Sequence, residues 1–87
     1  MTVNFPNASR SYDSAHRVIH FWGYDRSMEK SFSVTTEALR RIDPTIPANE
    51  AGFLGAFDRH RERIYATALK IYGLGRTGSY ELVAANF

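Results

Sequence analysis

The chain of 87 residues is long enough for one domain and too short for two. Apolar residues make up 44% of it, including six Phe, five Tyr and one Trp, so it can form a modest core. The absence of cysteine excludes disulfides and thiolate metal sites. Neither a signal peptide nor a run of ~18 apolar residues is visible, so we expect one cytoplasmic domain over residues 1–87 without membrane contact.

The charge is nearly balanced along the chain, with a net value of +2 although the pI is near 9.2. Residues 1–43 carry six basic and five acidic side chains, and residues 44–87 carry five and four. Nucleic-acid-binding proteins usually concentrate their basic residues on one face or segment. The even distribution therefore argues against a nucleic-acid partner without excluding it.

The first third of the chain is typical of β-strands. Residues 17–24 are rich in β-branched and aromatic types, and residues 28–34 alternate between polar and apolar side chains. Turn residues separate these two segments, and residues 9–13 are predicted to add a further strand. Pairing the two longer strands as a hairpin divides their side chains between two faces. The apolar face holds Ile19, Phe21, Met28, Phe32 and Val34, and the mixed face holds Val18, His20, Trp22, Tyr24, Ser27, Glu29, Ser31 and Ser33.

Two helices are predicted next, a short one over residues 35–42 that begins at a threonine cap and a long one over residues 49–72 that begins at an asparagine cap. The long helix would measure about 36 Å, whereas a domain of this size is about 30 Å across. We therefore expect it to overhang the domain or to fray near Gly52 and Gly55.

Gly73 and Gly75 end the long helix, and residues 79–86 form a last strand. Strands followed by helices and a strand indicate an α+β fold. We expect an antiparallel sheet, made of an N-terminal β-meander and the C-terminal strand, packed on one face by a short and a long helix.

Residues 73–78 match the G-x-G-x-x-G pattern of dinucleotide-binding loops. In that motif the glycines follow a strand and open a helix, so that phosphate meets the positive end of the helix dipole. Here they follow a helix, whose C-terminal end carries negative partial charge. We interpret the segment as a helix stop and a turn, and we expect no cofactor.

Arg61 lies within the apolar stripe of the long helix, and His60 lies at the edge of that stripe. The long stem of Arg61 can carry its charge out to water. Alternatively the charge is partly buried and paired with Asp13, Asp25 or Glu29, because an unpaired buried charge is very costly. In a third interpretation, Arg61 and His60 bind an anionic small molecule or take part in catalysis.

No recognisable metal or catalytic motif accompanies these residues. His16, His20 and His60 lack the spacing of a metal site. The sequence has no cysteine nucleophile, no G-x-S-x-G segment and no identifiable carboxylate pair. We therefore expect no metal and no catalytic residues, and an enzymatic function is not favoured.

The mixed sheet face is the most suggestive feature for function. If the helices cover the apolar face, His20, Trp22 and Tyr24 are left on an open face among serines. Aromatic residues on a sheet stack bases in single-strand binders, and exposed apolar surface also marks protein–protein contacts. No basic cluster flanks these aromatics, so we favour cover by the last strand, by the segment of Val3 and Phe5, or by a second copy.

Five segments in order are similar to those of a known family: MTVNFPNASRSYD, FWGYD, FSVTTEALRRI, AFDRHRERIYATALKIY and GSYELVAANF. Together they cover essentially the whole chain and resemble the small bacterial proteins grouped as domain of unknown function 1488. The resemblance implies a stand-alone, single-domain, cytoplasmic α+β protein, and it implies no activity or site residue.

These observations predict a non-enzymatic binding or accessory protein that acts through a protein partner or its own dimer. Nucleic-acid binding through the aromatic face is the second hypothesis. Binding or catalysis on an anionic small molecule around Arg61 and His60 is the third. A basic rim around Trp22 would favour the second hypothesis, and a concave pocket would favour the third.

Overall fold

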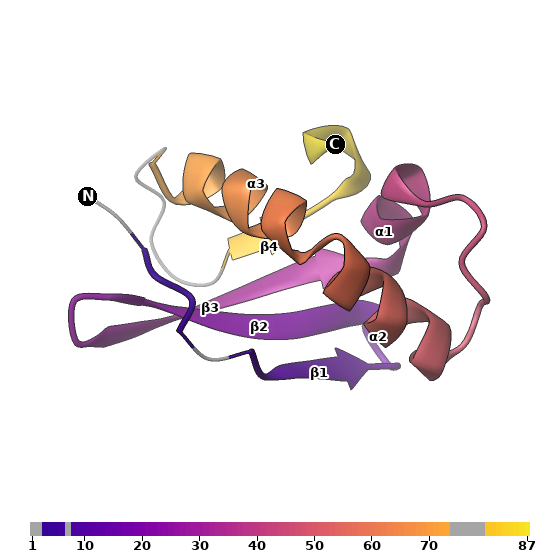
Figure 1. Cartoon of the computed structure of the whole chain (residues 1–87), viewed down its shortest axis with the longest axis horizontal. Helices are drawn as coiled ribbons and strands as arrows, with labels where there is room; N and C mark the ends of the chain where they lie inside the picture. Colours follow the sequence, from indigo (N-terminus) through magenta and orange to yellow (C-terminus); the bar gives the residue numbers. More distant parts are fainter. Residues whose placement is uncertain (1–2, 7, 74–79) are drawn as a thin grey trace.

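The computed structural model describes residues 3–6, 8–73 and 80–87. Its elements in chain order are β1 (Arg10–Asp13), β2 (Val18–Asp25), β3 (Met28–Thr35), α1 (Thr36–Ile42), α2 (Glu50–Arg59), α3 (Arg61–Gly73), β4 (Tyr80–Leu82) and the 3₁₀ turn η1 (Ala84–Asn86). The strands form one sheet in the order β1-β2-β3-β4, and the helices lie on one side of it (Figure 1). The predicted α+β class with helices on one face is confirmed.

The central hairpin of β2 and β3 has the two faces that the alternation predicts. Phe21 lies opposite Phe32, and Trp22 lies opposite Ser31. The connecting turn is therefore two residues long. The side chains of β2 and β3 lie on the faces of the sheet that the alternation predicts. Met28 shares the apolar face but is 63% exposed, because it lies beside the turn, where the hairpin extends past the helices (Figure 1).

The last strand runs parallel to its neighbour, which corrects the expectation of a wholly antiparallel sheet. β4 pairs with β3 in parallel register, with Phe32 opposite Tyr80 and Val34 opposite Leu82. The three helices lie in the crossover connection between the two strands, and β4 enters the sheet opposite Phe32 and runs in the same direction as β3. The sheet is mixed and mostly antiparallel, and the chain beyond β4 forms η1 instead of continuing as a strand to residue 86.

The predicted long helix over residues 49–72 is two helices that meet at His60. His60 has φ −110° and ψ 20°, which ends α2, while its carbonyl accepts the first hydrogen bond of α3 from the Ile64 N–H at 3.0 Å. The chain changes direction at this corner (Figure 1), so the elongated helix that we expected does not form.

The expected fraying near Gly52 and Gly55 is wrong. Gly52 lies in the first turn of α2, where its N–H donates to the Asn49 cap at 2.7 Å. A Cβ at Gly52 would lie 2.3 Å from the Pro47 carbonyl oxygen. This glycine therefore marks a close packing contact and not a weak point in the helix. Gly73 ends α3 as predicted, whereas residues 74–78 of the G-x-G-x-x-G segment and the predicted stop at Gly75 lie outside the described residues.

The core lies between the sheet and the helices, and the largest side chains in it are fully buried phenylalanines. Phe21 and Phe32 come from the sheet and Phe57 comes from α2. In the described parts of the chain, none of the helices combines the length and the apolar character that a membrane crossing needs.

Candidate functional site

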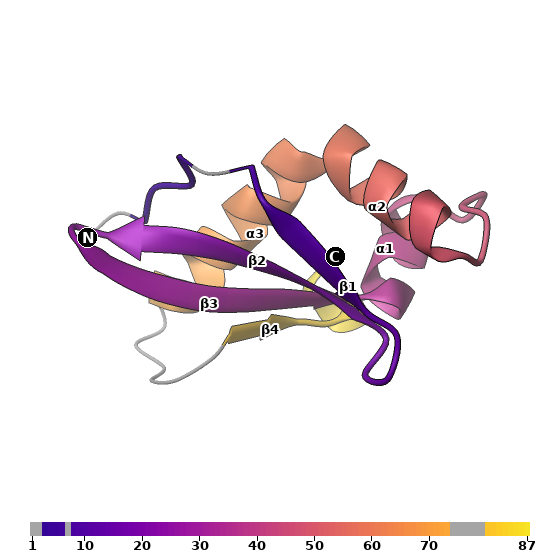
Figure 2. The same cartoon turned by 90° about the horizontal axis from the view of Figure 1, so that it is seen from below.

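The sheet face opposite the helices, here called the open face, carries the aromatic residues predicted for an interaction surface. Figure 2, seen from below, shows the strands passing in front of α3, with no helix on the near side. β2 presents half-buried His20, Trp22 and Tyr24 on this face. The strand residues of the open face are Ser11, Asp13, Val18, His20, Trp22, Tyr24, Glu29, Ser31, Ser33, Thr35 and Glu81.

Two of the three covers expected for the open face lie elsewhere. β4 joins the edge of the sheet beside β3 and does not cross the face. The Phe5 ring stacks on the Tyr65 ring of α3 at 4.0 Å, and a Cβ at Gly23 would lie 2.5 Å from Val3 Cγ1. Val3 and Phe5 therefore pack on the helix side of the sheet. Cover by a second molecule is the expectation that stays a prediction.

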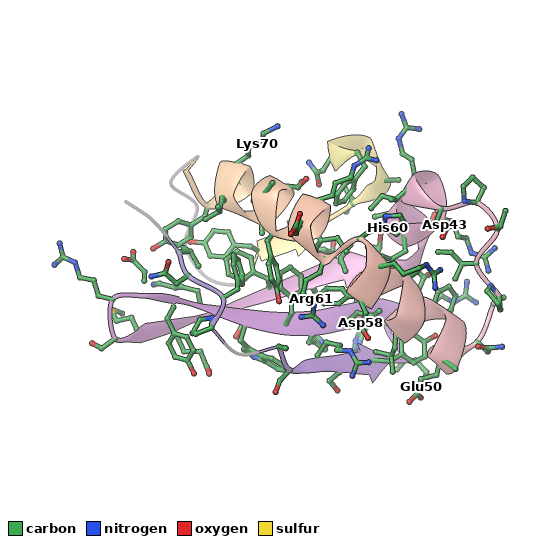
Figure 3. All side chains as sticks on the ribbon, viewed as in Figure 1. Asp43, Glu50, Asp58, His60, Arg61 and Lys70 are labelled. Carbon is green, nitrogen blue, oxygen red and sulfur yellow. The ribbon has the colours of Figure 1, made fainter. Side chains whose placement is uncertain are left out.

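The open face is acidic. In the four described strands its charged residues are Asp13, Glu29 and Glu81, whereas Arg10, Asp25 and Lys30 point to the helix side because side chains alternate along a strand. Lys70 of α3 also lies on the helix side of the sheet and points away from it (Figure 3). The charged strand residues of the open face are thus all acidic, whereas the helix side carries charges of both signs.

Two turn arginines, Arg17 and Arg26, lie at opposite ends of β2 and form no cluster near Trp22. The basic rim that would favour base stacking is therefore absent from the strands that the structure describes. Tyr24 donates to Glu29 at 3.2 Å, and this hydrogen bond raises the pKa of the Tyr24 hydroxyl. One aromatic residue of the open face is thus tied to one of its carboxylates.

A cluster that the sequence pattern did not predict lies at one end of the open face. Asp13 Oδ2 lies 2.8 Å from His16 Nδ1 and 3.3 Å from His20 Nε2, and Asp13 Oδ1 accepts the N–H groups of Ala15 and His16. The turn between β1 and β2 brings the two histidines to one carboxylate, although only His20 is on a strand. Within the described ranges, no group of three or more potential ligands is arranged to hold a metal ion.

The cluster should weaken the fold in acid. Hydrogen bonds from His16 and then His20 lower the pKa of Asp13 to about 2 from 3.8, so its stabilising contribution is complete above the usual value and is lost as the pH falls through that interval. We expect the free energy of unfolding of Asp13→Asn to depend less on pH than that of the wild type between about pH 5 and about pH 2.

Urea unfolding at several pH values measures this difference. Glu50→Gln is the matched control, because Glu50 is exposed and has no hydrogen-bonding or ionic partner among the described residues. An unchanged pH dependence in Asp13→Asn would show that the cluster does not hold the turn.

The second predicted site divides at the corner between α2 and α3, because His60 and Arg61 point to different carboxylates (Figure 3). His60 Nε2 lies 3.5 Å from Asp43 Oδ2, beyond the end of α1. Asp43 also accepts hydrogen bonds from Thr45 Oγ1 at 2.7 Å and from Arg59 at 3.1 Å. These bonds, first those of Thr45 and then that of Arg59, lower the pKa of Asp43 to about 2.

Arg61 points toward the sheet, and its charge is partly buried and paired with a carboxylate, which was the second interpretation of this residue. Its partner is Asp58, and its Nη1 donates to the Tyr65 hydroxyl at 2.7 Å and to the Ala8 carbonyl at 3.2 Å. Arg10 holds the other side of Asp58 with bonds of 2.8 and 3.0 Å. The carboxylate is therefore shared by two arginines.

The carboxylates expected to pair with Arg61 have other partners. Asp13 binds the two histidines, Asp25 accepts from Tyr72, and Glu29 accepts from Tyr24. The nearer Asp58, three residues back on the preceding turn, takes that role instead.

A hollow of about 460 Å³ lies at this corner and is lined by residues 58–63. Binding of an anionic small molecule around Arg61 and His60, the third hypothesis, requires a concave surface of this kind. His60 and Arg61 both line it, but their polar atoms are directed to Asp43 and Asp58 and not to a common point. Ligand binding by these two residues stays a prediction.

Comparisons with known proteins agree with the resemblance noted in the sequence. A family described as protein of unknown function (DUF1488) matches residues 3–83. The fold is similar to the crystal structure of a protein of unknown function from the DUF1488 family of Shewanella loihica PV-4, with a TM-score of 0.82, 18% identity and 94% of each chain covered. At this identity the likeness to that structure shows the fold alone. No curated protein matches the chain.

Proposed function

The chain belongs to the DUF1488 family, and from the geometry of its open face we propose that it is a cytoplasmic, single-domain, non-enzymatic binding protein that receives a basic surface of a protein partner. One observation carries the proposal: Trp22 and Tyr24 lie on a face whose charged strand residues are all carboxylates.

This combination suits arginine and lysine side chains. A guanidinium or ammonium group placed over a Trp or Tyr ring gains about 0.5–2 kcal/mol, and a carboxylate nearby adds a charge-assisted hydrogen bond. Trp and Tyr are also among the residues that contribute most to protein–protein affinity. The serines around Trp22 offer small polar groups and little steric hindrance to an approaching side chain.

A partner of different sequence is favoured over a second copy. In a two-fold dimer the same patch lies on both sides of the interface. The patch that carries Asp13, Glu29 and Glu81 would then face a second copy of the same acidic patch, and like charges brought together oppose association. The same carboxylates oppose a phosphate backbone, so nucleic-acid binding is the less favoured function.

Trp22 is the one tryptophan of the chain, so its fluorescence reports directly on the open face. We expect a short oligoarginine peptide to change this fluorescence saturably at physiological ionic strength. An oligoglutamate peptide and an oligothymidylate should cause no change. By calorimetry, Trp22→Ala and the pair Glu29→Gln with Glu81→Gln should each weaken binding of the arginine peptide by about tenfold or more.

The matched control is the pair Glu50→Gln with Glu62→Gln, which removes two exposed carboxylates from the helices and should leave the affinity unchanged. An equal loss of affinity in the two double variants would show that net charge causes the binding and that the open face is not the binding site. Tighter binding of the oligothymidylate would establish the nucleic-acid alternative. A dimer that sedimentation detects and Trp22→Ala dissociates would establish self-association instead.

A further inference from the structure

A second hollow lies where the turn between β1 and β2, the start of α1 and the start of α2 meet. Its volume is about 400 Å³, and its lining includes Tyr12, Arg17, Glu37, Arg40, Ala48 and Phe53. Ligand pockets commonly have volumes of about 300–1,000 Å³. The hollow is therefore large enough for a small organic molecule, and it is separate from both the open face and the corner at His60.

Two arginines in this lining have no carboxylate partner among the residues that the structure describes. Arg10, Arg59 and Arg61 are each paired with an aspartate. Arg17 and Arg40, in contrast, make no ion pair with any residue of the described ranges. These two guanidinium groups are therefore available to an anion that enters the hollow.

The charge of the lining favours an anion with a single charge. Glu37 shares the lining with the two arginines, so the three side chains together carry one net positive charge. A dianion such as phosphate would bring its second charge near Glu37. A carboxylate carries one charge, and its two oxygens match the donor pair of a guanidinium group.

The rest of the lining suits a flat apolar group. The centres of the Tyr12 and Phe53 rings lie 5.6 Å apart, and the Arg40 guanidinium lies 5.7 Å from the centre of the Phe53 ring. The Tyr12 hydroxyl makes no hydrogen bond with any residue that the structure places. Charged donors and aromatic carbon are thus side by side in one hollow, as an aromatic carboxylate requires.

The backbone at Arg17 has an unusual conformation for a residue other than glycine. Arg17 has φ 54°, in the left-handed region that glycine or asparagine adopts with less strain. Arg26, at the tip of the hairpin, has a similar φ of 61° but does not line the hollow, which makes it a matched comparison.

We propose that this hollow binds a small aromatic monocarboxylate, with Arg17 and Arg40 holding the carboxylate and the rings of Tyr12 and Phe53 contacting the aromatic body. The site is independent of the protein-partner function proposed above, because it lies among the helices and the β1–β2 turn. Benzoate is the probe, and benzamide, which has the same shape without the charge, is its neutral counterpart.

Titration of the isotope-labelled protein with benzoate, followed by NMR, tests the proposal. We expect saturable shifts centred on the lining residues, and we expect Arg17→Gly and Arg40→Gln each to weaken binding by about tenfold or more. Arg26→Gly should leave the affinity unchanged. Both glycine variants should raise the midpoint of thermal unfolding, because each relieves a strained backbone position.

Three results would overturn the proposal. Equal affinity for benzamide would show that the arginines do not recognise charge. Equal affinity for inorganic phosphate would show general anion binding without a role for the rings. Equal loss of benzoate affinity in Arg17→Gly and Arg26→Gly would show that net charge, and not this hollow, attracts the anion.

Discussion

Replacing Phe57 with alanine should lower the free energy of unfolding by about 4 kcal/mol, within the range of cavity-forming aromatic substitutions. Phe57 is fully buried where α2 rests on the sheet. The centre of its ring lies 5.2 Å from the centre of the Phe21 ring and 6.3 Å from that of the Tyr65 ring. The Arg61 guanidinium lies 4.9 Å from the centre of the Phe57 ring. The substitution therefore opens a cavity and removes a contact of each of these three neighbours.

Urea unfolding followed by circular dichroism measures this loss. Leu69→Ala is the control, because Leu69 lies on α3 but is 38% exposed, and its cost should be about 1 kcal/mol or less. A Phe57→Ala variant as stable as Leu69→Ala would mean that α2 does not pack on the sheet as described.

The sheet faces and the first helix could be predicted because local rules determine them. Alternation placed Ile19 and Phe21 on one face and His20 and Trp22 on the other, and a one-residue error would have exchanged the two sets. The Thr35 side chain accepts from the Ala38 N–H at 3.0 Å, as expected for a helix cap.

The helix break and the direction of β4 could not be predicted in this way. The apolar stripe continues from Phe57 to Ile64 and Ala68 across the break, and His60 carries no local signal that ends a helix. Its non-helical backbone accompanies contacts with distant residues, such as the one with Asp43. The direction of β4 depends on the path of the crossover, which a three-residue strand does not encode.

The candidate sites also differ in how far the sequence predicts them. The acidic character of the open face was present in the sequence, because the alternation that placed Trp22 also places Glu29 on that face. The acidic character is not visible in the charge balance along the chain, because that balance is nearly even. The hollow between Arg17, Arg40 and Phe53 had no comparable signal, because these residues meet only when the β1–β2 turn, α1 and α2 pack together.

Arg61→Ala should lower the free energy of unfolding by about 2 kcal/mol. The Arg61 side chain is 23% exposed and connects α2, α3 and the segment before β1 through Asp58, Tyr65 and the Ala8 carbonyl. Loss of a partner in a buried ion pair typically costs about 3–5 kcal/mol. The smaller value is expected here because Asp58 is 43% exposed and keeps its two bonds to Arg10.

Arg61→Met and Arg59→Ala separate the contributions to this loss. Methionine keeps the apolar stem over Phe57 but removes the hydrogen bonds, so its cost should lie between that of alanine and zero. Arg59 is 57% exposed in its pair with Asp43, and Arg59→Ala should change stability by about 0.5 kcal/mol at most. A neutral Arg61→Met would show that the stem alone matters. A neutral Arg61→Ala would remove the structural role and favour ligand binding at the corner, whereas a larger loss in Arg59→Ala would contradict the orientation of the helix itself.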